Sequence, residues 1–175
     1  AADSEGAAPL ANGGSIPTRG PLSALTVAGT IGGWQEALAF SAETSADERS
    51  PLPLSTLLSH AIRHANDGVA VSASQKALSE KHLAVLSQQP GFAERYLGQS
   101  ESGEPIALEE GARLRQPALA ATLSRLADAG LDDFYRGELA TRMAQELEAA
   151  GSPLRLADLN GYRAQRGHAA QGPSA

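Results

Sequence analysis

The sequence predicts a mainly α-helical segment with short extended pieces near both ends. Two observations predict this fold class. Apolar residues make up 42% of the chain, many of them alanine, and they recur every three or four positions through most of its length. Glycines and prolines stand where these helical patterns begin and end, and aromatic residues are only 4% of the chain. We therefore expect helices that pack closely through small side chains.

The first third of the chain begins with one extended piece and one helix. Leu25–Val27 is expected to form a short strand or an extended entry, and residues 29–42 a helix. Gly32 and Gly33 weaken the first turn of that helix, so we expect them to allow another part of the chain to approach closely. Three apolar residues share one face of this helix: Ile31, Trp34 and Leu38.

The strongest helical pattern follows a polar connector at 43–53. It begins at Leu54, and Gly68 supplies the stop signal at its C-terminal end. Its broad apolar stripe consists of Leu54, Leu57, Leu58, Ala61, Ile62 and Ala65. This stripe predicts a helix that packs against a hydrophobic core.

The middle of the chain predicts two further helices and a loop. Residues 72–89 form a helical pattern in which Ser74 is the candidate N-terminal cap. Pro90 opens a short helix that carries two aromatic residues, Phe92 and Tyr96. Residues 98–105 are rich in glycine, serine and glutamate and are expected to form a surface loop.

The stretch Arg115–Leu147 predicts a helical hairpin. Pro117 suits the first turn of its first helix, and Gly130 suits the left-handed end of that helix. Gly137 breaks the chain before a second helix, which ends at Gly151. The apolar residues of the two helices are Leu119, Leu123, Leu126, Leu139, Met143 and Leu147, and the aromatic residues at the corner are Phe134 and Tyr135.

The end of the chain and its length complete the expected organisation. A short helical turn is expected at Leu156–Leu159, and residues 165–175 are expected to be a frayed tail because they lack apolar bulk. We treat 1–175 as a single segment, either one domain or part of one, and expect a removed leader or an excised piece because no signal sequence opens it. The long connectors at 43–53 and 98–107 favour helices that wrap something larger over a regular bundle.

Composition excludes several classes of function. The net charge of −6 is spread along the chain, which argues against a nucleic-acid partner. No apolar run reaches the roughly 18 residues of a membrane span. The absence of cysteine excludes disulfides, thiolate catalysis and cysteine-ligated zinc. A periplasmic or secreted location and a cytoplasmic one both stay open.

One histidine pair has the spacing of metal ligands. His60 and His64 lie four residues apart on the helix that begins at Leu54, which is compatible with zinc. No further ligand is fixed by the sequence, and the glutamate that lies between the histidines of a zincin helix is absent. We therefore interpret them as part of a solvated or partly buried helix face and expect no metal or other cofactor.

Two acidic pairs also have a structural explanation. Asp132 and Asp133 are adjacent, and adjacent residues of a helix do not face each other, so they suit a helix N-terminus better than an acid/base pair. Glu109 and Glu110 are expected to be solvated. No nucleophile elbow and no glycine-rich phosphate loop is present. The residues alone therefore give no catalytic constellation.

The motifs of the chain, taken in order, resemble a known family. Gln116 opens Gln-Pro-x-Leu-Ala-x-Thr-Leu, and Gly130 opens Gly-x-x-x-Phe-Tyr-x-Gly-Glu-x-Ala. The flanking segments with matching motifs are Asp3–Pro9, Ile16–Gly29, Leu52–Gly68 and Leu156–Tyr162. Over roughly Asp3 to Arg163 the chain resembles the large subunit of the gamma-glutamyltransferase family, which is also called gamma-glutamyltranspeptidase and has cephalosporin-acylase-like members.

This resemblance implies part of an N-terminal-nucleophile (Ntn) hydrolase with an αββα architecture. Members are zymogens that cut themselves into two subunits, and the threonine that begins the small subunit attacks a γ-glutamyl amide, with its own α-amine as base. Water or an acceptor amino acid then takes the acyl group, as in glutathione metabolism. The expected partners are therefore a Thr-initiated small subunit, or the remainder of the precursor, and a small γ-glutamyl or related amide substrate. No catalytic residue is expected in this chain, because its sequence holds no Thr-Thr or Thr-x-His signature.

The chain departs from the family pattern where substrate is expected to bind. Many members carry Asp-x-Arg-Glu-x-Ala-Pro near the start, and that arginine grips the α-carboxylate of the substrate. Counting from Asp3, Glu5 holds the arginine position and Gly6 the next, while Ala7 stands where acylase-like members have arginine. The proline of the family's Val-Pro-Gly turn is Ala28. A carboxylate cannot replace a guanidinium in binding a carboxylate, so these changes count against glutathione as the substrate and are typical of a diverged protein.

Two hypotheses follow from the sequence. The chain is the helical large-subunit part of a gamma-glutamyltransferase-like or acylase-like hydrolase, or it is a non-catalytic helical interaction module that diverged from that family. A precursor with a threonine after a cleavage point favours the first hypothesis, and a gene that ends near Ala175 favours the second.

Overall fold

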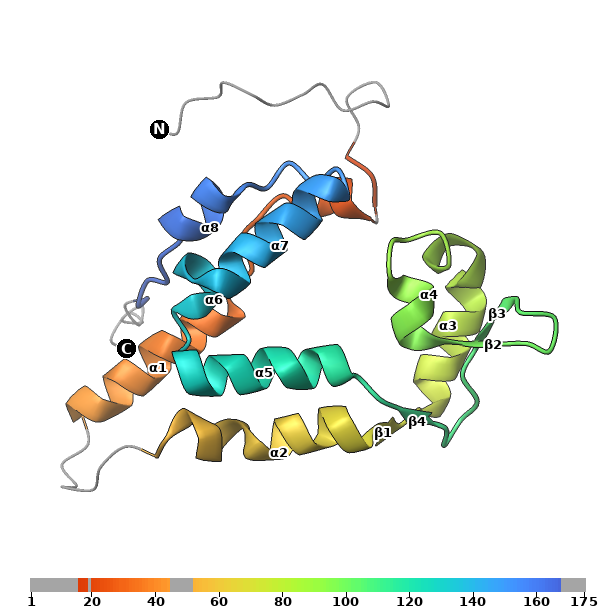
Figure 1. Ribbon diagram of the computed structural model, residues 1–175, viewed down its shortest axis with the longest axis horizontal. Coiled ribbons are helices and arrows are strands. Elements are labelled where there is room, and N and C mark those ends of the chain that lie inside the picture. The colour runs from red at the N-terminus through yellow and green to blue at the C-terminus, as the bar shows by residue number, and fades with distance from the viewer. Residues whose placement is uncertain (1–15, 19, 45–51, 168–175) are drawn as a thin grey trace, which may run out of the picture.

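The computed structural model describes residues 16–18, 20–44 and 52–167, which are mainly helical (Figure 1). The elements are η1 Pro21–Ser23, α1 Thr30–Thr44, α2 Leu54–Asp67, β1 Val69–Ala70, α3 Ala73–Leu86, α4 Phe92–Tyr96, β2 Leu97–Gln99, β3 Pro105–Ala107, β4 Arg113–Leu114, α5 Pro117–Ala129, α6 Asp133–Arg136, α7 Glu138–Ala149 and α8 Leu156–Gly161. The predicted helical class is confirmed. The short strands lie in the middle of the chain, not near its ends, where we expected extended pieces.

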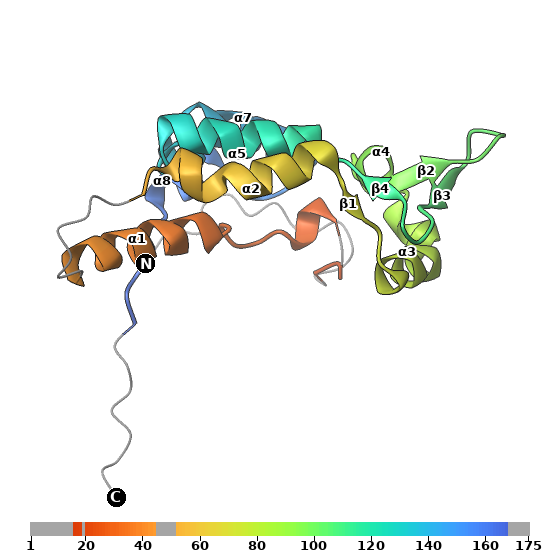
Figure 2. The ribbon, with the colours of Figure 1, turned by 90° about the horizontal axis from the view of Figure 1, so that it is seen from below.

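Helices α2 and α5 form an antiparallel pair at the centre of the molecule (Figures 1 and 2). Their buried residues include Leu58, Leu123 and Leu126, as their apolar stripes predict. Leu57 and Leu119 belong to the predicted stripes but lie at their edges and are exposed. The main core cluster consists of Ile31, Leu58, Leu123, Leu126, Leu131, Tyr135 and Leu139.

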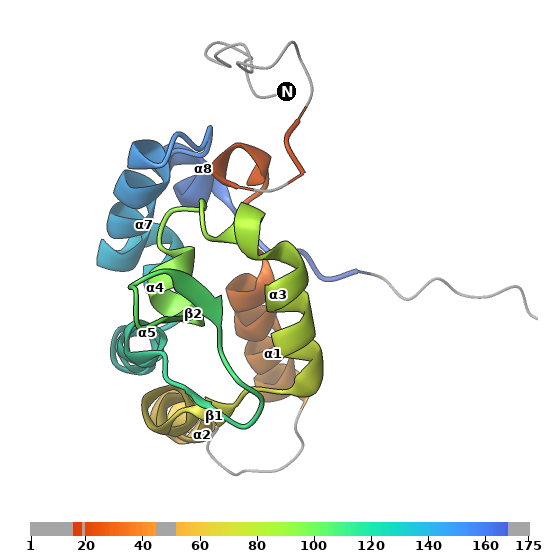
Figure 3. The same cartoon turned by 90° about the vertical axis from the view of Figure 1, so that its right-hand side faces the viewer.

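A two-stranded neck joins this pair to a smaller lobe formed by α3, α4 and the β2–β3 hairpin (Figure 1). Figure 3 shows α3, α4 and β2 of this lobe from the side. In the neck, β1 and β4 are antiparallel, with Val69 opposite Leu114. In the lobe, β2 and β3 are antiparallel, with Leu97 opposite Ala107. The surface loop expected at 98–105 is therefore a hairpin, and only its tip, from Ser100 to Glu104, lies outside the strands.

The cap of α3 differs from the predicted one. The side chain of Ser72, not that of Ser74, accepts a hydrogen bond from the backbone N–H of Gln75 at 3.2 Å. The helix therefore begins at Ala73, and Ser74 lies inside its first turn.

The C-terminal helices cover one side of the central pair. Helix α5 ends at Gly130, whose φ of 90° favours glycine, and α7 is followed by Gly151 with a φ of 81°. Helix α7 packs against both α6 and α8. Of the tail expected at 165–175, the structure describes 165–167, where Arg166 binds Glu36 and Glu43; the remaining tail residues lie outside the described part of the chain.

Helix α1 lies on the opposite side, below α2 in Figure 2. The expected helix over 29–42 is confirmed with slightly later bounds, whereas Leu25–Val27 is not a strand and follows the 3-10 turn η1. In the parts of the chain that the structure describes, no helix is long and apolar enough to cross a membrane.

Candidate functional site

A tyrosine joins three parts of the chain that are far apart in sequence. The hydroxyl of Tyr135 on α6 donates a hydrogen bond to the carbonyl oxygen of Ala28 at 2.7 Å and accepts one from the N–H of Gly32 at 2.8 Å. Its ring stacks on that of Tyr162, with the ring centroids 4.9 Å apart. We call Ala28, Gly32, Tyr135 and Tyr162 the tyrosine junction. It fixes the start of α1 against α6 and the end of α8.

The environment of Tyr135 suits a structural role. The side chain is only 1% exposed, and burial raises the pKa of its hydroxyl above the ordinary value. A neutral phenol can donate and accept at once, as the two bonds at this position require. The tyrosine junction therefore holds backbone in place, and nothing in its geometry points to proton transfer.

A second network joins α5, α6 and the start of α7. Arg125 donates from Nε to Oδ2 of Asp133 at 2.6 Å and from Nη2 to Oδ1 at 2.9 Å. The same carboxylate accepts the backbone N–H groups of Glu138 at 3.1 Å and Leu139 at 3.3 Å. A Cβ at Gly137 would collide with the Asp133 carboxylate, so glycine is required at that position. Asp133 thus caps α7 as well as pairing with Arg125.

The two adjacent aspartates have separate partners, as the sequence argument against an acid/base pair requires. Asp132 binds Arg136, whose Nε lies 2.7 Å from Oδ1, and Asp133 binds Arg125. In each case the hydrogen bond from the arginine lowers the pKa of the carboxyl below its ordinary value. Both side chains are therefore structural carboxylates that stay ionised near neutral pH.

The sequence alone did not reveal these roles. It placed both aspartates at the start of a short helical turn, and the structure confirms this: Asp132 precedes α6 and Asp133 is its first residue. The sequence did not predict that Asp133 also caps the following helix. The sequence signal that could have revealed this network was the spacing of Asp133, Gly137 and Glu138, with Arg125 eight residues before Asp133 in helix α5. The link from Tyr135 to Gly32 joins residues 103 positions apart and has no local signal.

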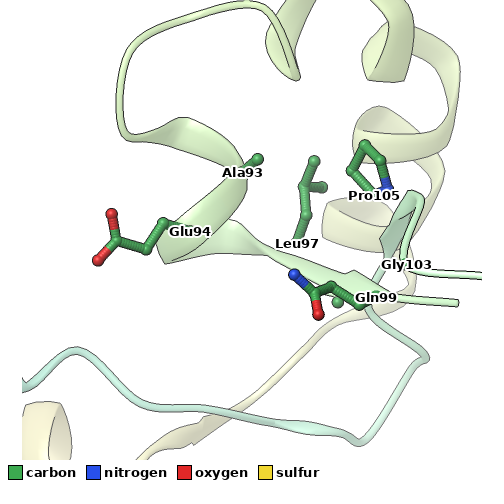
Figure 4. Close-up of a pocket in the computed structure, with 7 residues that line it drawn as sticks. Ala93, Glu94, Leu97, Gln99, Gly103 and Pro105 are labelled. Carbon is green, nitrogen blue, oxygen red and sulfur yellow. The ribbon is translucent and has the colours of Figure 1, made fainter.

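A hollow lies between α4 and the β2–β3 hairpin (Figure 4). Figure 4 shows Leu97 between Ala93 and Pro105, with the carboxylate of Glu94 turned away from them. The lining residues are Ala93, Glu94, Leu97, Gly98, Gln99, Gly103 and Pro105. Glu94 is the only charged group in this lining, so the hollow holds no paired acid and base of the kind that hydrolysis requires.

The remaining candidates from the sequence are surface residues or lie outside the described part. His60 and His64 are exposed on α2, and the described residues contain no group of three or more metal-ligating side chains. Glu109 is exposed and binds Lys76 at 2.7 Å. Glu5 lies outside the described residues, so its expected place in substrate binding stays a prediction.

Comparison with known proteins gives one consistent result. The model of the family described as Gamma-glutamyltranspeptidase matches residues 4–173. The chain is 49% identical over 151 residues to the oxamate amidohydrolase proenzyme of Klebsiella pneumoniae, covering 86% of this chain and 27% of that protein. It is 31% identical to the glutathione hydrolase-like YwrD proenzyme of Bacillus subtilis, covering 86% of this chain and 26% of that protein.

Solved structures agree with these relatives. The cephalosporin acylase from Bacillus halodurans matches with a TM-score of 0.65 and 27% identity, over 85% of this chain and 26% of that one. A gamma-glutamyltranspeptidase from Pseudomonas nitroreducens, complexed with L-DON, matches with a TM-score of 0.61 and 30% identity, over 78% of this chain and 36% of that one. The chain spans about a quarter of the length of the curated relatives that it matches.

Proposed function

Because the chain belongs to the gamma-glutamyltranspeptidase family, we propose that it is the helical large-subunit part of a self-cleaving amide hydrolase. The complete protein carries the reacting groups in its remainder, with a threonine nucleophile at the start of a small subunit. Several of the relatives are named as proenzymes, which supports a precursor that is cut before it acts.

The substrate we propose is oxamate or a small amide of the same kind. The observation that carries this proposal is the 49% identity to the oxamate amidohydrolase proenzyme, against 31% to the glutathione hydrolase proenzymes of Escherichia coli and Pseudomonas aeruginosa. Hydrolysis of oxamate breaks its C–N bond, releases ammonia and leaves oxalate. The threonine hydroxyl attacks the amide carbonyl, ammonia leaves, and water then releases the acyl group.

The departure at Glu5 supports a substrate that differs from a γ-glutamyl compound. No arginine stands in the segment Asp3–Pro9, and Glu5 carries the wrong charge to bind an α-carboxylate. Oxamate also carries a carboxylate, so the proposal requires a cation outside Asp3–Pro9 to bind that group.

The described residues contribute rigidity to this enzyme. The tyrosine junction and the Arg125–Asp133 pair fix four helices and the start of α1 relative to one another. Arg125 and Asp133 neutralise each other's charge, so neither side chain is free to bind a charged substrate. A rigid set of packed helices of this kind holds the reacting groups of the remaining part of the protein in place.

The proposal is tested by comparing two substrates of the complete, processed protein. The measurement is kcat/KM for oxamate, followed by ammonia release, and for L-γ-glutamyl-p-nitroanilide, followed by absorbance. We expect a preference for oxamate of at least about tenfold, which corresponds to about 1.4 kcal/mol in transition-state binding. A preference for the γ-glutamyl substrate would contradict the proposal.

A variant of Glu5 tests the placing of this residue in the same assay. Glu5→Arg is expected to lower KM for the γ-glutamyl substrate, because it restores a guanidinium that can bind the α-carboxylate. Glu5→Gln is the control, since it removes the negative charge without supplying that group. An unchanged KM in Glu5→Arg would show that Glu5 does not occupy the arginine position.

A further inference from the structure

An asparagine–glycine pair ends helix α8, which lies beside α7 in Figure 1. Asn160 and Gly161 are the last two residues of this helix, and both are exposed. Leu159, which is 3% exposed, holds the helix against α7. The next residue after the pair is Tyr162, whose ring belongs to the tyrosine junction. The pair therefore connects an exposed helix end to a contact that joins distant parts of the chain.

Asparagine is a thermolabile residue, because its side-chain amide reacts with the backbone of the residue that follows it. The backbone nitrogen of that residue loses its proton and attacks Cγ of the asparagine. The new C–N bond closes a succinimide ring, and the side-chain nitrogen leaves as ammonia. Water then opens the ring at either carbonyl. One product is an aspartate, and the other is a β-aspartyl linkage, in which the backbone is longer by one carbon atom.

Gly161 favours this reaction at Asn160. A side chain on the residue after the asparagine crowds the attacking nitrogen, and glycine has none. Glycine also allows the backbone to leave helical geometry, which ring closure requires. A Cβ at Gly161 would meet no atom of the described residues within 4 Å, so the surroundings leave room for the rearranged backbone.

The end of α8 gives little protection against ring closure. The helix has only six residues, and helices of this length have little stability of their own. The N–H of Tyr162 binds the carbonyl oxygen of Leu159, three residues earlier, at 3.1 Å, which is the tighter 3-10 pattern with its poorer hydrogen-bond geometry. We therefore expect the backbone at Gly161 to open while the rest of the structure stays folded.

Asn66 provides a comparison within the same chain. It is exposed and precedes the last residue of α2, as Asn160 precedes the last residue of α8. The residue after it is Asp67, which has a side chain, and α2 has 14 residues and packs on α5. The third asparagine, Asn12, lies outside the described residues. The two described asparagines thus share exposure and position but differ in the features that control ring closure.

We propose that Asn160 is a site of spontaneous deamidation in the folded protein, and that its β-aspartyl product loosens the tyrosine junction. The added carbon atom lies between buried Leu159 and Tyr162. The carbonyl oxygen of Tyr162 accepts a hydrogen bond from Nη1 of Arg136 at 3.1 Å, and its ring stacks on Tyr135, so this residue has fixed partners. A longer backbone changes the spacing between the two packed side chains. The junction is therefore expected to weaken as the protein ages.

The first measurement follows deamidation in the complete protein. The protein is kept at about pH 8.5 and about 37 °C and then digested at acidic pH. Mass spectrometry of each asparagine peptide detects the gain of about 1 Da when –NH2 becomes –OH. We expect Asn160 to react at least about tenfold faster than Asn66, and within about tenfold of its own rate in guanidinium chloride. Gly161→Ala, at a position with room for a methyl group, is expected to slow the reaction at least about tenfold.

Three results of this measurement would overturn the proposal. They are equal rates at Asn66 and Asn160, a native rate at Asn160 far below the rate in guanidinium chloride, and an unchanged rate in Gly161→Ala. The first two would show that the folded structure protects the pair. The third would show that the backbone nitrogen of residue 161 is not the attacking group.

The second measurement tests the effect on the tyrosine junction. The N–H of Gly32 binds the hydroxyl of Tyr135 at 2.8 Å, so its hydrogen exchange reports opening of the junction. Exchange is compared in fresh and aged protein, with the β-aspartyl content quantified by an isoaspartyl methyltransferase. We expect exchange at least about tenfold faster in molecules that carry the linkage.

Two variants serve as controls for this comparison. Fresh Asn160→Asp adds the negative charge without the longer backbone and is expected to exchange at the wild-type rate. Aged Gly161→Ala reports any other effect of storage and is expected to match its fresh sample. Unchanged exchange in the β-aspartyl molecules, or equal acceleration in either control, would overturn the proposed effect of the linkage. None of these readouts depends on the proposed amide hydrolysis.

Discussion

Gly32 and Gly33 are neighbours in the sequence, but among the described residues only Gly32 lies against other side chains. A Cβ at Gly32 would lie 2.9 Å from Cε1 of Tyr162 and 3.2 Å from the hydroxyl of Tyr135, whereas one at Gly33 meets nothing within 4 Å. The close approach predicted for both glycines is confirmed for Gly32, whose N–H also binds Tyr135. Gly33 has no such contact.

This difference predicts opposite effects of the same substitution. Gly32→Ala is expected to lower the free energy of unfolding by about 1–3 kcal/mol, because the added methyl group forces the tyrosine junction apart. Gly33→Ala is expected to raise it by up to about 1 kcal/mol, because alanine favours a helix over glycine. Urea unfolding followed by circular dichroism measures both, and equal effects of the two changes would contradict the described packing.

The paired carboxyl of Asp133 makes the free energy of unfolding depend on pH. Arg125 and two backbone N–H groups lower the pKa of its carboxyl in the folded state, so the folded state binds this proton less readily than the unfolded chain does. Its stabilising contribution is therefore present above the unfolded pKa of about 3.9 and is lost as the pH falls through the lower, folded-state pKa.

We expect the wild-type chain to lose more stability between pH 6 and pH 2.5 than Asp133→Asn loses. The variant starts lower, by about 2 kcal/mol at pH 7, because its amide cannot form the charged pair. The check is a series of urea unfolding curves across that pH range, with Asp128→Asn, a change outside this network, as the control. Parallel curves for the wild type and Asp133→Asn would show that the pair does not contribute.

At the scale of the element, the start of α3 depends on one hydroxyl. Ser72 accepts the N–H of Gln75, so Ser72→Ala is expected to cost about 1 kcal/mol in the free energy of unfolding. Ser74→Ala is the matched control and is expected to change it by less than about 0.5 kcal/mol, since Ser74 is exposed and, in the described part of the chain, its hydroxyl hydrogen-bonds to that of Ser72 alone. Thermal unfolding measures the loss of stability in each variant. A larger loss in Ser74→Ala than in Ser72→Ala would identify Ser74 as the cap, as the sequence suggested.

Some elements could be predicted from the sequence because their signals are local. Helices α2 and α5 carry long apolar stripes with stop signals at Gly68 and Gly130, and both were predicted to within a residue. The strands could not be predicted, because β1 and β4 have two residues each and form only by pairing across more than 40 positions. The β2–β3 hairpin was not predicted, because the glycine, serine and glutamate residues at its tip favoured a surface loop.

At the scale of the whole molecule, the described residues form a helical scaffold that is packed at its centre and open along α1. The family and the helical class were accessible from the sequence, because motifs such as the one that contains Tyr135 are collinear with those of the family. The network roles of Tyr135 and Asp133 were not, since both depend on contacts between elements. The polar groups of these networks bind one another, and in the proposed function the reacting atoms belong to the remainder of the protein.

The location of the reacting groups can be measured directly with the 175-residue chain. The chain is assayed alone, and also co-expressed with the remainder of the protein as a separate polypeptide, for ammonia release from oxamate and for p-nitroanilide release from the γ-glutamyl substrate. We expect no turnover by the chain alone and measurable turnover by the combined polypeptides. Turnover by the chain alone, at a rate above that of buffer, would contradict the placing of the nucleophile outside it.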